Sequence, residues 1–116
     1  MCKDYIGIIV EESLDDNRIL NGLDFRNVHI TGHENPADRW HIFEINVSAE
    51  EIAELSKHIT GNWYMHFWKG TDIIAVFRDK IFRFNYDDKN TWGEVLEYGR
   101  SIGIPDSQLD FPIEGL

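Results

Sequence analysis

The sequence predicts a single α+β domain with a mostly antiparallel sheet, and three observations support this. Its 116 residues have the length of one ordinary domain. Several short apolar and aromatic runs have the period of two that is typical of strands, whereas other segments show helical spacing behind capping residues. Apolar residues make up 42% and charged residues 28%, which excludes collagen-like, low-complexity and wholly disordered chains. We therefore expect one domain over residues 1–116.

The chain is expected to begin with a buried strand and a short helix. Residues 5–10 are almost continuously apolar, as in a central strand that is covered on both faces. Ser13 is a residue type that caps helices, and Asp15 and Asp16 behind it suit the positive end of a helix dipole. The sequence therefore predicts a helix from Ser13 to Gly22.

A hairpin is expected next. Apolar and polar residues alternate over residues 28–33, and residues 40–47 have the same period of two. The polar stretch between these runs contains Pro36, which suits a loop because proline donates no hydrogen bond to a sheet. We expect the two runs to pair as antiparallel strands.

The clearest helix begins after Ser48. Ser48 and Glu51 have the spacing of a capping box, in which each side chain accepts a hydrogen bond from the backbone N–H of the other residue. Apolar residues at helical spacing follow, and Gly61 suits the left-handed turn that ends many helices. This pattern predicts a helix between two strands of the sheet.

The C-terminal half should contain further strands and one helix. Residues 63–68, 73–77 and 81–86 are rich in bulky and aromatic side chains, which suit a pleated surface. A last helix is predicted from near Thr91 to Gly103, where glycine and a following proline end it. The remaining tail is expected to be an ordered but irregular wrap.

The order of the first six elements resembles the ferredoxin-like, split βαβ arrangement, βαββαβ. The resemblance is one of fold only and spans roughly the first 70 residues by the count of elements. It implies that the first strand lies between the third and the fourth, because crossover connections are right-handed. A C-terminal β-hairpin and helix extend this core. No family signature accompanies the resemblance, so it assigns no catalytic residue.

Charge and motifs exclude several classes of partner. The 21 acidic and 11 basic residues give a net charge of −10, which repels nucleic acid and anionic lipid. No apolar run approaches the roughly 18 residues of a membrane span. The single cysteine, Cys2, permits no intramolecular disulfide, and no glycine-rich phosphate motif is present. We expect a cytoplasmic protein that binds no cofactor, nucleic acid or membrane.

Pairing across the predicted hairpins assigns side chains to the two faces of the sheet. A tight turn at residues 70–71 places Tyr64, His66 and Trp68 on one face, away from the first two predicted helices. The length of the turn after Phe77 decides whether the next strand adds more rings to this face. In either case the face is too aromatic to be left in water.

Three ways of covering this aromatic face remain open at this point. The favoured one is a homodimer in which a second copy of the chain covers what the last helix leaves free. A second is a pocket for a small aromatic ligand, lined by Trp40, Tyr64, His66 and Trp68. The third is complete coverage by the chain itself.

Catalysis has weaker candidates. If Thr31 lies opposite Ile42, then His29 faces Glu44, which would raise the pKa of the imidazole and fix its tautomer. His66 is the other candidate acid or base. An ordinary polar pair on a solvated sheet explains His29 and Glu44 more simply, since an acid or base also needs a pocket and a substrate.

A metal site is not expected. His29 and His33 are four residues apart, which on a strand separates them by about 13 Å at roughly 3.3 Å per residue. One metal ion with bonds of about 2 Å cannot bind both. We therefore predict no metal ligands.

The predicted function is a small, non-catalytic binding or assembly domain that self-associates through its aromatic sheet face. One alternative is an enzyme that resembles the cofactor-free dimeric α+β barrels in fold only. There His66, His29 and Trp68 would position or deprotonate an aromatic or quinone-like substrate. The other alternative is a sensor of small aromatic ligands.

Overall fold

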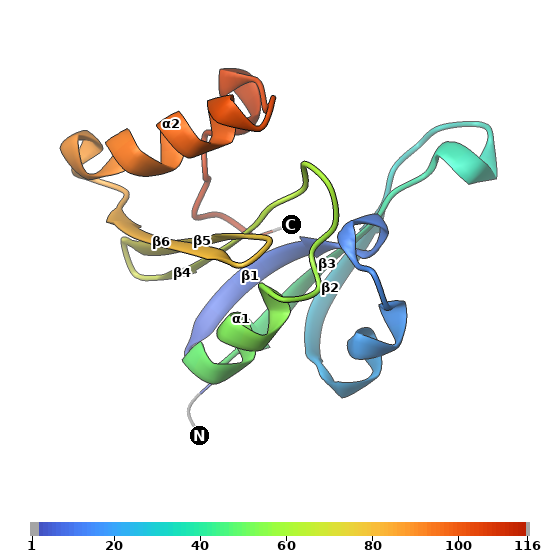
Figure 1. Cartoon of the computed structure of the whole chain (residues 1–116). Helices are drawn as coiled ribbons and strands as arrows, with labels where there is room; N and C mark the ends of the chain where they lie inside the picture. Colours follow the sequence, from blue (N-terminus) through green and yellow to red (C-terminus); the bar gives the residue numbers. More distant parts are fainter. Residues whose placement is uncertain (1–2, 116) are drawn as a thin grey trace.

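The computed structural model describes residues 3–115, so Cys2 lies outside the described residues. Within that range six strands form one antiparallel sheet in the order β2-β3-β1-β4-β5-β6 (Figure 1). The strands are β1 Tyr5–Val10, β2 Asp24–Ile30, β3 His41–Val47, β4 Met65–Lys69, β5 Asp72–Phe77 and β6 Lys80–Asn85. The predicted α+β class and the position of the first strand between the third and the fourth are confirmed.

Two α-helices accompany the sheet in the described residues, α1 Ala49–Leu55 and α2 Gly93–Ser101. The predicted capping box begins α1: the Glu51 amide donates to Ser48 Oγ at 3.3 Å, and the Ser48 amide donates to Glu51 Oε1 at 3.0 Å. The other helical segments are short 3₁₀ turns, η1 Glu11–Ser13, η2 Asn17–Gly22, η3 Pro36–Asp38, η4 Lys89–Trp92 and η5 Asp106–Gln108.

The α-helix predicted from Ser13 to Gly22 is wrong, because η1 ends at Ser13, residues 14–16 are not helical and the 3₁₀ turn η2 forms the rest of the segment. Ser13 does not cap a helix: its hydroxyl donates to the carbonyl of Val10 at 2.6 Å. Its own carbonyl accepts from the Thr60 amide at 2.8 Å, beside an antiparallel bridge between Leu14 and Ile59. Pairing with a distant segment thus replaces the local hydrogen bonds that an α-helix would need.

The β2–β3 hairpin keeps the predicted faces but not the predicted partners. His29 lies opposite Ile42, a shift of two residues from the predicted pairing of Thr31 with Ile42. A shift of two leaves each side chain on its face, because side chains alternate with a period of two. The loop over residues 31–40 is correspondingly longer, and Thr31 Oγ1 accepts from the Trp40 amide at 2.8 Å to close it.

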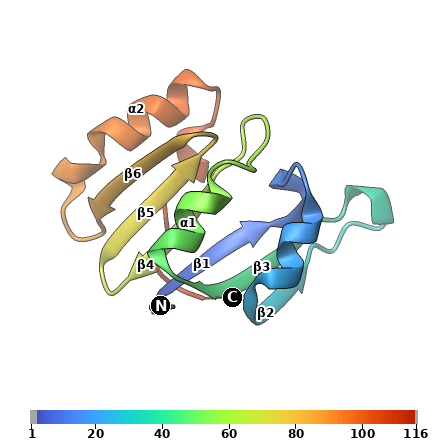
Figure 2. The same cartoon turned by 60° about the horizontal axis from the view of Figure 1, so that its bottom comes forward.

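The two faces of the sheet have separate cores. Figure 2 shows α1 in front of β1 and β4, where it packs on Ile9, Ile45 and Phe67. On the opposite face, α2 and the segment after it cover β4, β5 and β6 (Figure 1). The buried residues of this second core are Ile73, Ala75, Phe77, Phe84, Trp92, Val95, Ile104, Leu109 and Phe111.

The aromatic face over β4, β5 and β6 is covered largely by the chain's own C-terminal part, so its rings are buried without a second copy. His66 is only 7% exposed and Trp68 only 6%. The C-terminal tail wraps irregularly over these rings, and Phe111 packs edge-on to His66 at 6.0 Å between ring centroids. Trp40 stays exposed beside these covered rings, and self-association through this face, including the dimeric barrel alternative, stays a prediction.

The turn after β5 resolves the alternative left open by the sequence. Phe77 pairs with Lys80, which leaves two loop residues, and Asp79 adopts a left-handed φ of 58° between them. Phe82 and Phe84 consequently lie on the face that α2 covers. The large apolar side chains that remain exposed on the edge strand β2 are Phe25, Val28 and Ile30.

Candidate functional site

An aromatic groove of about 370 Å³ lies where the C-terminal tail crosses the sheet beside the segment that precedes β4. Its volume is within the range of roughly 300–1,000 Å³ that small-molecule pockets occupy. The groove receives side chains from β1, from the ends of two loops, from β4 and from the tail. Its lining residues are Ile8, Val10, Trp40, Asn62, Trp63, Tyr64, His66, Gln108, Asp110 and Pro112.

The structure brings together three of the four predicted ligand-binding residues. Trp40, Tyr64 and His66 line the groove. Trp68 does not line it; its ring stacks on His66 at 5.4 Å between centroids and supports that imidazole within the core. Trp63 was not predicted as a site residue, but it meets Trp40 edge-on at 5.0 Å and forms the groove wall with it.

His66 is fixed by one hydrogen bond. Its Nε2 donates to the carbonyl oxygen of Pro112 at 2.7 Å. Because a carbonyl only accepts, Nε2 carries the proton, and in the neutral ring Nδ1 is an acceptor. Among the described residues no group donates to Nδ1. Burial lowers the pKa of His66, although the Pro112 bond and the charge of Asp110 oppose this, so the ring is neutral at pH 7.

Tyr64 is an equally rigid wall of the groove. Its hydroxyl donates to the carbonyl oxygen of Gln108. Its ring packs against Phe77 and Phe111 at 5.5 and 5.3 Å between centroids. Burial raises the pKa of Tyr64, and the nearby Asp110 carboxylate raises it further. The hydroxyl is therefore protonated at neutral pH, and its proton is used within the fold.

Asp110 supplies the charge of the groove. It is exposed, and it lies close enough to Tyr64 and His66 for its carboxylate to raise the pKa of both. Within residues 3–115, Asp110 forms no hydrogen bond or ion pair through its carboxylate. The lining includes no lysine or arginine. Asp110 was not predicted because a single aspartate in an irregular tail has no pattern that distinguishes it.

The predicted His29–Glu44 pair does not form. Glu44 is buried, and its Oε2 accepts from Arg26 Nε at 2.8 Å. A bulge between Phe25 and Asn27 accompanies this contact. His29 lies on the exposed edge strand opposite Ile42. His29 and Glu44 thus lie in separate surroundings. Of the three predicted catalytic candidates, only His66 lines the groove.

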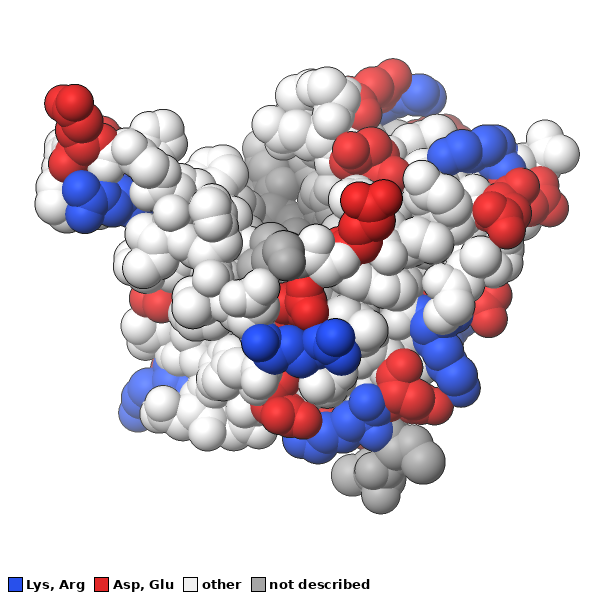
Figure 3. Space-filling model, turned by 180° about the vertical axis from the view of Figure 1, so that it is seen from behind, with Lys and Arg blue, Asp and Glu red and all other residues white. Residues whose placement is uncertain are grey.

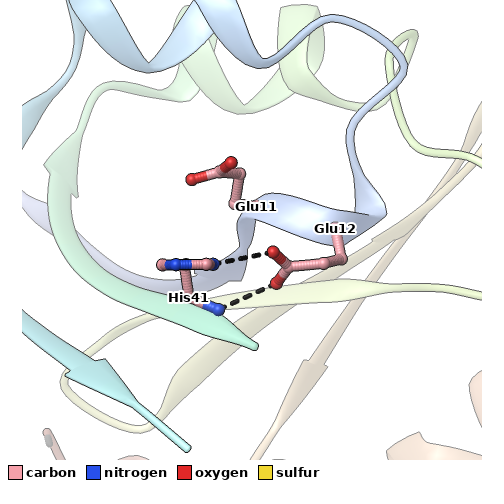
Figure 4. A group of neighbouring side chains, drawn as sticks. All are labelled: Glu11, Glu12 and His41. Atoms are coloured by element: carbon pink, nitrogen blue, oxygen red, sulfur yellow. Dashed lines mark hydrogen bonds and ion pairs between the residues drawn. The ribbon is translucent and has the colours of Figure 1, made fainter. Parts of the chain in front are cut away.

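A cluster that the sequence did not predict joins η1 to β3. Ligand atoms of Glu11, Glu12 and His41 lie within 4.8 Å of one another (Figure 4). Both oxygens of Glu12 accept from His41, from its amide and from its Nδ1, each at 2.8 Å. The bond to Glu12 raises the pKa of His41. These hydrogen bonds account for the cluster as an anchor that holds η1 against the start of β3.

A second hollow of about 410 Å³ lies over β5 and β6. Three of its polar residues bond one another: the Asn85 amide donates to Thr91 Oγ1 at 3.0 Å, and Asn85 Nδ2 donates to Asp72 Oδ1 at 3.2 Å. Those groups serve the fold. The aromatic groove differs because His66 and Asp110 retain acceptor atoms that the fold does not use.

The lowered pKa of His66 predicts a loss of stability in mild acid. The unfolded chain takes up a proton at its ordinary pKa of about 6.5, whereas the folded chain binds it only at lower pH. The free energy of unfolding should therefore fall as the pH drops below about 6.5. Denaturant titrations at pH 7.5 and 5.5 would measure this fall, and His66→Gln should lack this part of it. An equal fall in both proteins would contradict the assignment.

Comparisons with protein-family models, with curated proteins and with solved structures find no match for this chain. None of the helices within residues 3–115 is long and apolar enough to cross a membrane. Acidic and basic side chains lie next to one another over the face seen in Figure 3, without the continuous basic surface that binds nucleic acid. The function is therefore argued from the geometry of the groove.

Proposed function

We propose that this chain is a binding domain for a small molecule with an aromatic or apolar body, and that the ligand occupies the aromatic groove. One observation supports this above the others. Three rings from two separate segments, Trp40 from one and the adjacent Trp63 and Tyr64 from the other, converge on one cavity beside a buried histidine that has an unused acceptor nitrogen. Mostly apolar walls with a few placed polar groups are typical of small-molecule sites.

The exposure of Trp40 supports the same proposal. Its side chain is 44% exposed, whereas Trp68 and Trp92 are buried. Covering such a partly exposed ring with a ligand is favourable by roughly 25 cal/mol for each Å² of apolar surface removed from water. A flat ligand between Trp40 and the wall of the groove would provide that cover.

We favour binding over catalysis because the predicted acid–base pair is not formed and the side-chain protons of His66 and Tyr64 are committed to the fold. The His29–Glu44 pair that would have supplied an acid and a base is not formed. In the groove, the protons of His66 Nε2 and the Tyr64 hydroxyl are both donated to backbone carbonyls. This arrangement holds the rings still, which suits recognition.

The strand order supports the ferredoxin-like, split βαβ description for the first four strands. Their order is β2-β3-β1-β4, all neighbours are antiparallel, and α1 connects β3 to β4. The turns η1 and η2 stand where that arrangement has its first helix. The groove lies on the face opposite α1, where the extra C-terminal segment crosses the sheet.

Nuclear magnetic resonance on the whole chain would test the proposal. Single-ring and double-ring aromatic compounds should shift the indole N–H signals of Trp40 and Trp63, while that of Trp92, which donates to the Asn85 carbonyl, stays in place. Trp40→Ala should weaken binding about tenfold. The matched control Ile81→Ala removes an exposed apolar side chain from β6 and should bind normally. Shifts that avoid the groove, or equal binding by both variants, would refute the proposal.

A further inference from the structure

His66 and Tyr64 donate their side-chain protons within the fold rather than into the groove. The proton of His66 Nε2 is donated to Pro112 and that of the Tyr64 hydroxyl to Gln108. The lone pair of His66 Nδ1 and the carboxylate of Asp110 have no donor among residues 3–115, and the carboxylate is the one charged group of the lining. The neutral donors of the lining, the side-chain amides of Asn62 and Gln108 and the indole N–H groups, add no positive charge. The Nδ1 atom and the carboxylate only accept in these states, so a ligand completes them by donating N–H or O–H groups.

The aromatic walls of the groove also favour a positively charged ligand. The faces of indole and phenol rings carry negative charge density and attract cations, with tryptophan the strongest. Two tryptophans and a tyrosine line this groove, and the edge-on contact of Trp40 with Trp63 at 73° presents differently oriented rings to its interior. A positively charged group therefore gains from the walls as well as from the carboxylate.

Charge around the groove points in the same direction. The lining contains Asp110 but no lysine or arginine, so an anionic ligand finds no counter-ion there. Glu11 and Glu12 follow the lining residue Val10 in the chain, and Glu12 bonds His41, the residue after Trp40 (Figure 4). The whole chain has a net charge of −10. This field raises the local concentration of cations and repels carboxylates and phosphates.

From these observations, and resting on the proposed function, we infer that the aromatic groove selects organic cations. The ligand is a protonated amine on a small apolar or aromatic body. Its ammonium group lies toward Asp110 and donates to the free acceptors, and its body lies against Trp40 and Trp63. Asp110 determines the specificity for charge, and the rings provide the contact area.

Three probes that share one ring and differ in charge would test this inference: 2-phenylethylamine, 2-phenylethanol and phenylacetate. Each would be titrated into the whole chain at low ionic strength, with the indole signals of Trp40 and Trp63 as the readout. We expect the amine to bind at least about tenfold more tightly than phenylacetate, with the alcohol between them. Added salt should reduce the difference, because it screens the charge of Asp110.

Asp110→Asn isolates the carboxylate. It should weaken binding of the amine about threefold, as expected for an exposed charge pair, and leave binding of 2-phenylethanol unchanged. Asp87→Asn changes the net charge equally at an exposed residue beyond β6 and should leave all three affinities unchanged.

The outcomes separate the two proposals. If phenylacetate binds the groove as tightly as the amine, or if Asp110→Asn binds the amine normally, the inference about charge is refuted while the site stands. If none of the three probes shifts Trp40 or Trp63, the binding proposal itself is refuted, and the inference with it.

Discussion

Replacing Phe111 with alanine is expected to lower the free energy of unfolding by about 3–5 kcal/mol, the usual cost of removing a fully buried phenylalanine. Phe111 is 0% exposed although it lies in an irregular tail. Its backbone adopts a left-handed φ of 42°, which is uncommon for a residue with a bulky side chain. Packing holds it there: its ring contacts those of Tyr64, His66, Phe84 and Trp92, with centroids 5.0 to 6.0 Å apart.

The same substitution should disturb the groove, since Asp110 and Pro112 flank Phe111 and both line it. Denaturant unfolding would measure the stability, and the histidine signal of His66 would report whether its bond to Pro112 persists. Ile113→Ala, a partly buried change in the same tail, is the matched control and should cost far less. Equal losses for the two variants would show that Phe111 does not anchor the tail.

The aromatic surplus of the second face and its partial cover by the last helix were predictable from the sequence, but the position of the tail that completes the cover was not. Alternation along residues 64–68 placed Tyr64, His66 and Trp68 on one face, and the structure agrees. The cover is provided by α2 together with Phe111 and its neighbours, which have neither helical nor strand periodicity. An irregular segment is positioned by long-range packing, so local patterns indicate that it wraps and give no sign of where.

The candidate site shows the same division. Trp40, Tyr64 and His66 were predicted because aromatic residues on strands have a definite face. The pairing of His29 with Glu44 failed because it depended on the length of a loop, and the bulge near Arg26 gave Glu44 a different partner. Alternation predicts which face of the sheet a side chain lies on, but not which residue of the neighbouring strand lies opposite it. A pair of catalytic groups depends on the opposite residue. Neither alternation nor strand pairing could predict Asp110, because it lies in an irregular segment.

Gly7→Val is expected to destabilise the fold by more than about 3 kcal/mol, against the preference of strands for valine. Gly7 lies in the central strand β1 opposite Phe67 of β4. A β-carbon built there would be 2.0 Å from Phe67 Cδ1, and that ring is fully buried, so it has no room to retreat. The strand propensity scale spans only about 1 kcal/mol, so the steric overlap outweighs it and the substitution lowers the free energy of unfolding.

The smaller change Gly7→Ala keeps the test informative if the valine variant does not fold. It should lower the free energy of unfolding by about 2 kcal/mol, and Phe67→Leu in the same chain should offset part of that loss by vacating the ring position. Gly93→Ala is the matched control: a β-carbon there meets nothing within 4 Å, and Gly93 begins α2 with a helical φ of −53°. The same chemical change should leave that site unchanged or stabilise it by up to about 1 kcal/mol. If denaturant unfolding shows Gly7→Ala to be as harmless as Gly93→Ala, the close contact between β1 and the Phe67 ring does not exist in solution.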